Sequence, residues 1–108
     1  MRQEHPGQLS AVIDHATSGN NEIVAAVAGK KIRVLSGLLI AGGTVTVRFE
    51  SGPGGAALTG QMPLVANSGF SLTYNSEGWW QTAAGESLNL ELSGAISVDG
   101  VLNYDLIS

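Results

Sequence analysis

The side chains of this sequence that could do acid–base chemistry are few and scattered along the chain. Glu86 with Glu91, or Asp99 with Asp105, would form a paired-carboxylate hydrolytic site if folding brought the two partners together. Because only 13% of the residues are charged, the same carboxylates are more simply explained as the solvated faces of two strands. We therefore expect no catalysis from them.

A metal site and an activated nucleophile are also poorly supported. His5, His15 and Asp14 lie on two sides of an expected turn, and the histidines lack H-x-H or H-x-x-x-H spacing. The chain contains no cysteine, and no serine stands in a G-x-S-x-G elbow. The sequence predicts no metal, no cofactor and no enzyme activity.

One glycine-rich segment has the residue types of a nucleotide-binding motif but lacks the helix that the motif requires. Residues 52–57 read G-P-G-G-A-A and follow an expected strand, as a G-x-G-x-x-A motif should. In a dinucleotide site these glycines open a helix whose N-terminus holds the pyrophosphate. Residues 58–63, L-T-G-Q-M-P, cannot form that helix. We interpret the segment as a hairpin loop.

The charge balance argues against a nucleic acid partner, and the length of the apolar runs argues against a membrane span. The net charge is −4, and Lys30, Lys31 and Arg33 are the only tight basic group, which is more typical of a solvated strand end. No run approaches the roughly 20 apolar residues of a membrane span, and the first residues lack the apolar segment of a signal peptide. We expect a soluble protein that starts at Met1.

Short apolar runs separated by glycines and turn residues predict strands rather than helices. The clearest is 44–50, in which Val45, Val47 and Phe49 alternate with polar residues. The same alternation places Leu88, Leu90 and Leu92 inward, with Asn89 and Glu91 outward. Strands are expected at 9–16, 22–28, 31–41, 44–50, 70–74, 87–93, 95–98 and 101–107. The fold class is all-β: a single antiparallel β-sandwich, jelly-roll-like, of about eight strands, with an immunoglobulin-type sandwich as the rival.

The segment 31–41 is apolar on both sides. If it were a regular strand, one side would carry Ile32, Val34, Leu38 and Ile40, and the other Leu35, Leu39 and Ala41. Such a strand is either central in the fold or covered by another subunit. We take Leu35 and Leu39 as candidates for self-association.

Trp79 and Trp80 are the only tryptophans and are neighbours. On a strand, adjacent side chains point to opposite faces, so one ring should close the core while the other lies at the surface. The outer ring would be an anchor for a protein partner or a platform for a sugar. Register decides which Trp is which, and a bulge at Gly78 would exchange them.

The chain divides into an N-terminal arm with the start of the first strand, 1–20, and a sandwich domain, 21–108. The first part is more polar and carries Pro6, Gly7 and both histidines. Arg2 and His5 are its candidate contact residues, because an arm can order on a larger partner.

Three segments carry a resemblance to a known group of proteins. Residues 23–36, 58–64 and 78–90, together with the closing strand 101–104, resemble small virion structural proteins of tailed bacteriophages. The resemblance spans about 21–107 and offers no catalytic motif. It implies a β-sandwich with a structural role, of the type that decorates or cements the phage head.

These inferences give one main expectation and two alternatives. We expect a non-enzymatic auxiliary capsid protein that is assembled in the host cytoplasm and binds the major capsid protein on the outer surface of the virion head. It would form a homotrimer through Leu35 and Leu39 and contact the capsid through Trp79 or Trp80 and the 1–20 arm. One alternative is a tail-associated carbohydrate- or receptor-binding module, in which the outer Trp acts with Tyr74, Asn75 or Gln81. The other is a purely structural tail or baseplate sandwich.

Overall fold

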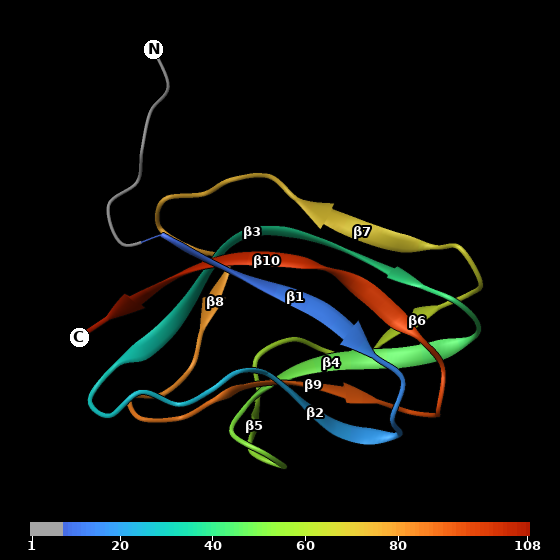
Figure 1. The fold of residues 1–108 in the computed structure, drawn as a ribbon, viewed down its shortest axis with the longest axis horizontal. Helices are drawn as coiled ribbons and strands as arrows, with labels where there is room; N and C mark the ends of the chain where they lie inside the picture. Colours follow the sequence, from blue (N-terminus) through green and yellow to red (C-terminus); the bar gives the residue numbers. More distant parts are fainter. Residues whose placement is uncertain (1–7) are drawn as a thin grey trace.

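A computed structural model describes residues 8–108, which form ten strands and no helix (Figure 1). This part of the chain therefore has no helix that could cross a membrane. The strands are β1 (Leu9–His15), β2 (Gly19–Val24), β3 (Lys31–Ala41), β4 (Val45–Ser51), β5 (Ala56–Ala57), β6 (Met62–Leu64), β7 (Gly69–Leu72), β8 (Trp80–Gln81), β9 (Leu88–Leu92) and β10 (Val98–Ile107).

The strands form two antiparallel sheets packed face to face. Sheet A has the order β1-β10-β3-β7, with β8 pairing the other end of β3; sheet B has the order β2-β9-β4-β5, with β6 also pairing β4. The two layers lie one above the other in Figure 1, and the principal extents are 37 × 34 × 19 Å. The predicted all-β sandwich is confirmed, whereas the jelly-roll description stays a prediction.

Alternating side chains from both sheets form the core between them. On β4, Val45, Val47 and Phe49 are at most 2% exposed, as their period of two predicts. On β9, Leu88, Leu90 and Leu92 are buried in the same way. Burying each such side chain contributes about 1.5–3 kcal/mol, so these strands fix the packing of sheet B onto sheet A.

Some predicted strand limits need correction. The expected strand 101–107 belongs to β10, which starts at Val98 and continues through Gly100, whereas residues 95–97 of the expected strand 95–98 lie outside any strand. A Cβ at Gly100 would lie 2.0 Å from the carbonyl oxygen of Leu38, so this glycine permits close strand pairing instead of a turn. The expected strand 22–28 lies earlier, as β2 from Gly19 to Val24, whereas β1 begins at Leu9, as the expected strand 9–16 does. β1 and the first residues of β2 thus lie within the segment 1–20, which was expected to hold the arm and the start of the first strand.

A β-bulge in β3 changes which side chains point inward. Tyr104 pairs with Val34 and Asn103 pairs with Ser36, so Leu35 is an extra residue without a partner on β10. Beyond the bulge, the residues that point inward have odd numbers, whereas before it they have even numbers. Val34 lies on the inner face before it, and Leu39 lies on the same inner face after it, both fully buried. The expected division of the two sides of 31–41 is therefore wrong beyond Leu35, because it assumed an uninterrupted strand.

The glycine-rich segment after β4 is a hairpin, as predicted. Ser51 pairs with Ala56 and Glu50 pairs with Ala57, which returns the chain onto β4 as β5. Gly52 and Gly54 have φ angles of 77° and 67°, a region that favours glycine. The backbone amide groups at this position therefore serve a turn, and no helix follows them.

Candidate functional site

The outer face of sheet A exposes a group of apolar side chains on adjacent strands. One row across the sheet pairs Val12 with Val101, and Val101 with Leu38. Ile40 stands two residues further along β3, on the same side as Leu38. Val12, Leu38 and Ile40 are 72%, 45% and 50% exposed. We call Val12, Leu38, Ile40 and Val101 the apolar face. Packing within the chain leaves it uncovered by residues 8–108.

A polar row closes one end of the apolar face. The Ser10 hydroxyl donates to Asn103 Oδ1 over 2.7 Å, and the Asn103 amide donates to Ser36 Oγ over 2.8 Å. These residues occupy the next outward positions of β1, β10 and β3. Because each uses its partners within the sheet, this row contributes a rigid polar border.

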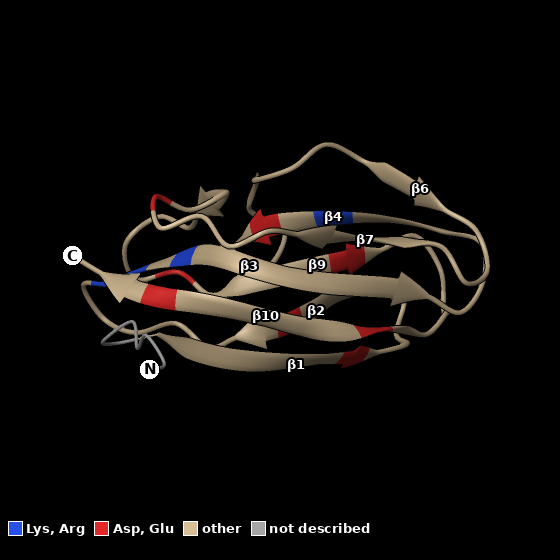
Figure 2. Cartoon of the chain, turned by 90° about the horizontal axis from the view of Figure 1, so that it is seen from above, with Lys and Arg blue, Asp and Glu red and all other residues tan. Residues whose placement is uncertain are grey.

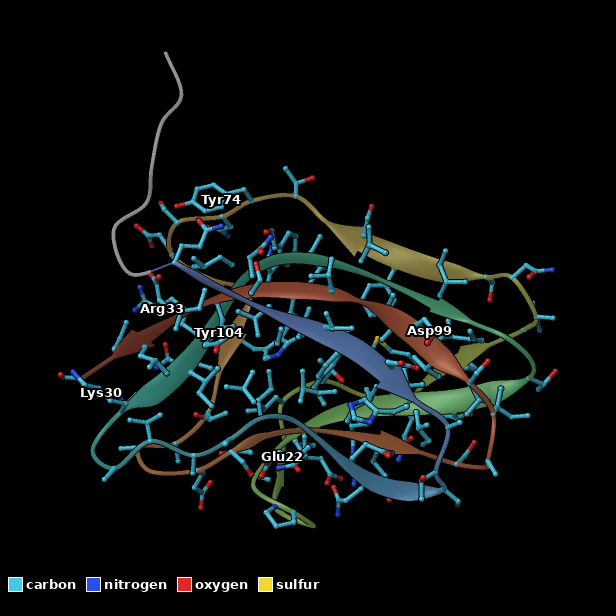
Figure 3. All side chains as sticks on the ribbon, in the orientation of Figure 1. Glu22, Lys30, Arg33, Tyr74, Asp99 and Tyr104 are labelled. Atoms are coloured by element: carbon cyan, nitrogen blue, oxygen red, sulfur yellow. The ribbon has the colours of Figure 1, made fainter. Side chains whose placement is uncertain are left out.

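An acidic pair borders the opposite end. Asp14 of β1 stands directly across from Asp99 of β10, and Asp99 is in turn paired with Ile40. Like charges directly opposite on two strands destabilise a sheet, so this pair is not explained by folding alone. Lys30 and Arg33 lie at the other end of the molecule from Asp99 (Figures 2 and 3). Figure 2 also shows acidic segments at the end of Lys30 and Arg33, where Asp105 of β10 pairs with Arg33, so carboxylates occur at both ends of the molecule.

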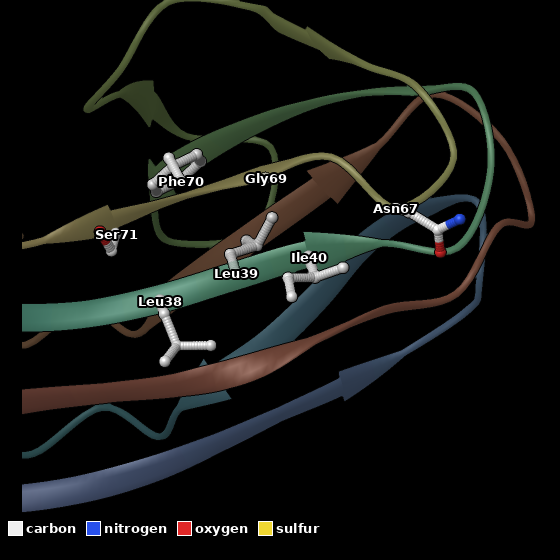
Figure 4. A pocket seen from close by; sticks show the side chains of 7 residues that line it. All are labelled: Leu38, Leu39, Ile40, Asn67, Gly69, Phe70 and Ser71. Atoms are coloured by element: carbon white, nitrogen blue, oxygen red, sulfur yellow. The ribbon is translucent and has the colours of Figure 1, made fainter.

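A hollow of about 330 Å³ lies between β3 and β7, beside the apolar face (Figure 4). Gly69 allows β7 to pair closely with β3 here, since a Cβ there would lie 1.8 Å from the Leu39 carbonyl oxygen and would push β7 away. Asn67 and Ser71 supply its polar groups. The lining residues are Leu38, Leu39, Ile40, Asn67, Gly69, Phe70 and Ser71. With no acid or base among them, the hollow is suited to receiving an apolar side chain of a partner.

The two tryptophans lie on opposite sides, as predicted. Trp80 packs against the core, with its ring centroid 5.0 Å from that of Phe49 and the planes at 37°. Trp79 is 47% exposed, and its indole Nε1–H donates to the Thr73 carbonyl over 2.9 Å. The structure thus identifies Trp79 as the outer ring. Its hydrogen bond holds that ring against the loop before β8.

The same loop exposes a second aromatic ring. Tyr74 is 49% exposed and lies at the same end of the molecule as Arg33 (Figure 3). Asn75 Oδ1 accepts the Glu77 amide over 2.9 Å and thereby tightens the turn. Gln81 follows on β8, paired with Arg33. The residues predicted for a sugar platform therefore come from one connected segment.

A polar cluster on the outer face of sheet B was not predicted. Glu50 is fully buried although it lies on the outer side of β4, and its Oε2 accepts the Nε–H of Arg48 over 3.0 Å. Arg48 Nη2 also donates to Glu91 Oε1 over 2.9 Å. With its amide oriented to satisfy both groups, Asn20 donates to Glu50 Oε1 and accepts the Gly54 amide. The loop before β5 and the neighbouring strands together cover this carboxylate.

The two carboxyl groups of this cluster, Glu50 and Glu91, have pKa values shifted in opposite directions. Burial by itself would raise the pKa of Glu50, but hydrogen bonds to Glu91 and Arg48 and the charge of Arg48 hold that pKa below its ordinary value. The pKa of Glu91 is raised, chiefly by its hydrogen bond with Glu50. Glu50 is therefore the carboxylate that stays ionised. Since it is fully buried, the cluster is best explained as a structural connection between β2, β4 and β9.

The carboxylate pairs considered from the sequence do not form. Glu86 accepts the Ser51 hydroxyl over 2.5 Å, whereas Glu91 contacts Arg48. Asp99 and Asp105 lie on the same strand, the first exposed and the second buried. The carboxyl group close to Glu91 is that of Glu50. In the sequence, Glu50 belongs to the polar side of the predicted strand 44–50, and this pattern did not indicate that its side chain is buried.

The remaining predicted site residues fall in different places. Leu35 and Leu39 are fully buried within the single chain, so they are core residues and the exposed leucine of β3 is Leu38. Arg2 and His5 lie outside the described residues. Within residues 8–108, no cluster of three or more histidine, aspartate or glutamate side chains could hold a metal ion.

No family model and no curated protein matches this chain.

Proposed function

We propose that this protein is a non-enzymatic auxiliary capsid protein that binds the outer surface of a tailed-phage head and stabilises the shell. The observation that supports the proposal is the apolar face of sheet A. Exposed apolar groups gathered on neighbouring strands, with polar borders, are typical of a surface that a protein partner covers.

The two outer faces of the sandwich differ in a way that gives the protein an orientation. Sheet B presents the Arg48–Glu91 ion pair and polar strand residues, whereas sheet A presents Val12, Leu38 and Ile40. Water solvates the first face well and the second poorly. A protein attached to a large assembly would accordingly turn sheet A towards it and sheet B towards solvent.

The borders of the apolar face indicate the chemistry of the partner. Asp14 and Asp99 stand side by side at one end, so a lysine or arginine of the partner would relieve their repulsion. The hollow beside Leu38 and Ile40 would take an apolar side chain. A matching surface on the major capsid protein would therefore combine a projecting apolar residue with a nearby cation.

Many weak contacts are sufficient for such a role. A protein that occupies repeated positions on a symmetric shell stabilises it through the number of sites, and each site needs only modest affinity. The resemblance of residues 21–107 to virion proteins agrees with this role and with a location on the head.

The test is binding to capsids assembled without the protein. The unmodified chain should sediment with such capsids and raise the temperature at which they release their contents. Ile40→Asp places a charge in the apolar face and should abolish both effects. Val65→Asp is the matched control, because Val65 is also exposed, at 60% against 50% for Ile40, but follows β6 of sheet B. No binding by the unmodified protein, or equal binding by Ile40→Asp, would contradict the proposal.

A second candidate is a carbohydrate- or receptor-binding module of the tail. The observation that favours it is the exposure of Trp79 and Tyr74 on one loop, since exposed aromatic rings stack on sugars. A glycan array distinguishes the two functions: hits that disappear with Trp79→Ala and persist with Ile40→Asp would favour the tail module. An array without hits would reject it.

A further inference from the structure

The edges of the two sheets are not equally protected against pairing with another chain. Most edge strands are interrupted or short. β2 carries a bulge next to the charged Glu22, and β6 contains Pro63. β7 has 4 residues, β6 has 3, and β5 and β8 have 2 each. These features are the ones by which natural proteins prevent edge-to-edge association.

β1 is the exception among the described edges. It has 7 residues, and all pair with β10 without a shift of register, so the strand is regular from Leu9 to His15. It contains neither proline nor glycine, and its one carboxylate, Asp14, lies near one end. At its centre Val12 is 72% exposed, the largest value among the exposed large hydrophobic residues.

The backbone of β1 also has unused hydrogen-bonding capacity. In an antiparallel strand with one neighbour, every second residue points its N–H and C=O groups away from that neighbour. No residue in 8–108 outside β10 forms a backbone hydrogen bond with β1. A regular, apolar and unpaired edge of this length is suited to accept an antiparallel strand.

We propose that the partner is a second copy of the same chain, paired antiparallel through β1 about a two-fold axis at Val12. This register is the only symmetric one that pairs all seven residues, because a two-fold axis at any other position leaves residues unpaired at both ends. A two-fold dimer replaces the homotrimer expected from the sequence, since Leu35 and Leu39, on which that expectation rested, are buried.

The side chains suit this register. On the outer face the exposed Val12 meets its own copy, which removes both from water. Asp14 faces the small neutral Ser10 of the other copy, so the two acidic groups stay apart. On the inner side Ala11 faces Ile13, a small residue opposite a large one. Pairing centred on Asp14 would instead place two carboxylates opposite each other.

Dimerisation would extend the apolar face. The row formed by Leu38, Val101 and Val12 would continue through the Val12 of the second copy to its Val101 and Leu38, so one stripe would cross both sheets. This inference does not depend on the capsid role, because pairing through β1 requires only this chain.

The absence of cysteine makes a direct test possible. In Val12→Cys, the two introduced thiols would be directly opposite, with Cβ atoms about 4.5–5.5 Å apart, close to disulfide geometry. Mild oxidation should convert this variant to a covalent dimer. Leu9→Cys is the control on the same strand, because Leu9 would face His15 of the other copy and its own copy would lie about 20 Å away. Equal cross-linking of the two variants would overturn the proposed register.

Sedimentation of the full chain tests the dimer without a cross-link. The unmodified protein should sediment as a dimer at micromolar concentration, and Val12→Lys should weaken the association at least tenfold, because two ammonium groups would meet at the axis. Ile40→Lys, on the same face but away from the edge, should remain a dimer. Thermal unfolding of both variants checks that they fold. A monomeric unmodified protein, or equal effects of the two substitutions, would overturn the inference. A persistent dimer that fails to bind capsids would contradict the proposed function alone.

Discussion

Replacing the two tryptophans one at a time should separate their roles. Trp80→Ala removes a ring that packs against Phe49 and the core, and truncation of a large aromatic core residue costs about 3–5 kcal/mol. Because Trp80 is only partly buried, we expect the lower end, about 3 kcal/mol. Trp79→Ala removes a ring that is 47% exposed, so its cost should be about 1 kcal/mol.

Urea unfolding followed by fluorescence measures both costs, since each variant keeps one tryptophan as its own reporter. A difference of about 2 kcal/mol changes the folding equilibrium about 30-fold and separates the two midpoints by about 1 M urea. The folded Trp79→Ala protein, which keeps Trp80, should also emit at shorter wavelength.

The aromatic contact itself can be isolated with a double-mutant cycle. Phe49→Leu combined with Trp80→Ala should show a coupling energy of about 1 kcal/mol, whereas Phe49→Leu with Trp79→Ala should be additive. Trp80→Phe should cost less than Trp80→Ala, because no described residue accepts a hydrogen bond from the buried Trp80 Nε1. Equal costs for the two alanine substitutions, or coupling of Phe49 to Trp79, would refute this assignment of inner and outer rings.

Three further predictions concern the sheets. Stability from Glu50 should be present above pH 4.5 and lost as the pH falls through the lowered pKa of the folded state; in Glu50→Gln this acid-side loss of thermal midpoint should be smaller. Gly69→Ala should destabilise the fold by about 2–3 kcal/mol, whereas Gly60→Ala, where a Cβ meets nothing within 4 Å, should leave the urea midpoint unchanged. Leu35→Ala should cost about 2–5 kcal/mol and Leu38→Ala less than about 1 kcal/mol by the same measurement; equal costs would contradict the observed bulge.

The regular strands were accessible from the sequence because alternation and burial agree in them. In 44–50 the apolar residues all occupy one side, so period alone identified Val45, Val47 and Phe49 as core. The same logic placed one tryptophan inside and one outside. It could not decide between them, because that choice depends on pairing with β3.

In segment 31–41, the alternation of residue types cannot identify which side faces the core. When both sides of a strand are apolar, composition does not indicate the inner side, and the bulge at Leu35 is decided by pairing with β10. The candidate surface was missed for the same reason. Val12 and Ile40 become notable only when β1, β10 and β3 are placed side by side. The burial of Glu50 likewise depends on the loop before β5 and on Asn20 of β2, which lie against its carboxylate.

The bulge in β3 determines which residues in the second half of the strand face the core and which face outward. Deletion of Leu35 would leave Val34 and Ser36 as neighbours opposite Tyr104 and Asn103, so the strand would pair regularly and its other residues would keep their sides. If instead Leu35 were kept and paired in register, the second half of β3 would shift by one position, so that Leu38 and Ile40 would turn inward and Leu39 and Ala41 outward. Both versions are apolar on both sides, so hydrophobicity would not oppose the exchange. A one-residue shift of register at this site would therefore turn half of the strand over, and it would change the external surface of the protein without any change of sequence.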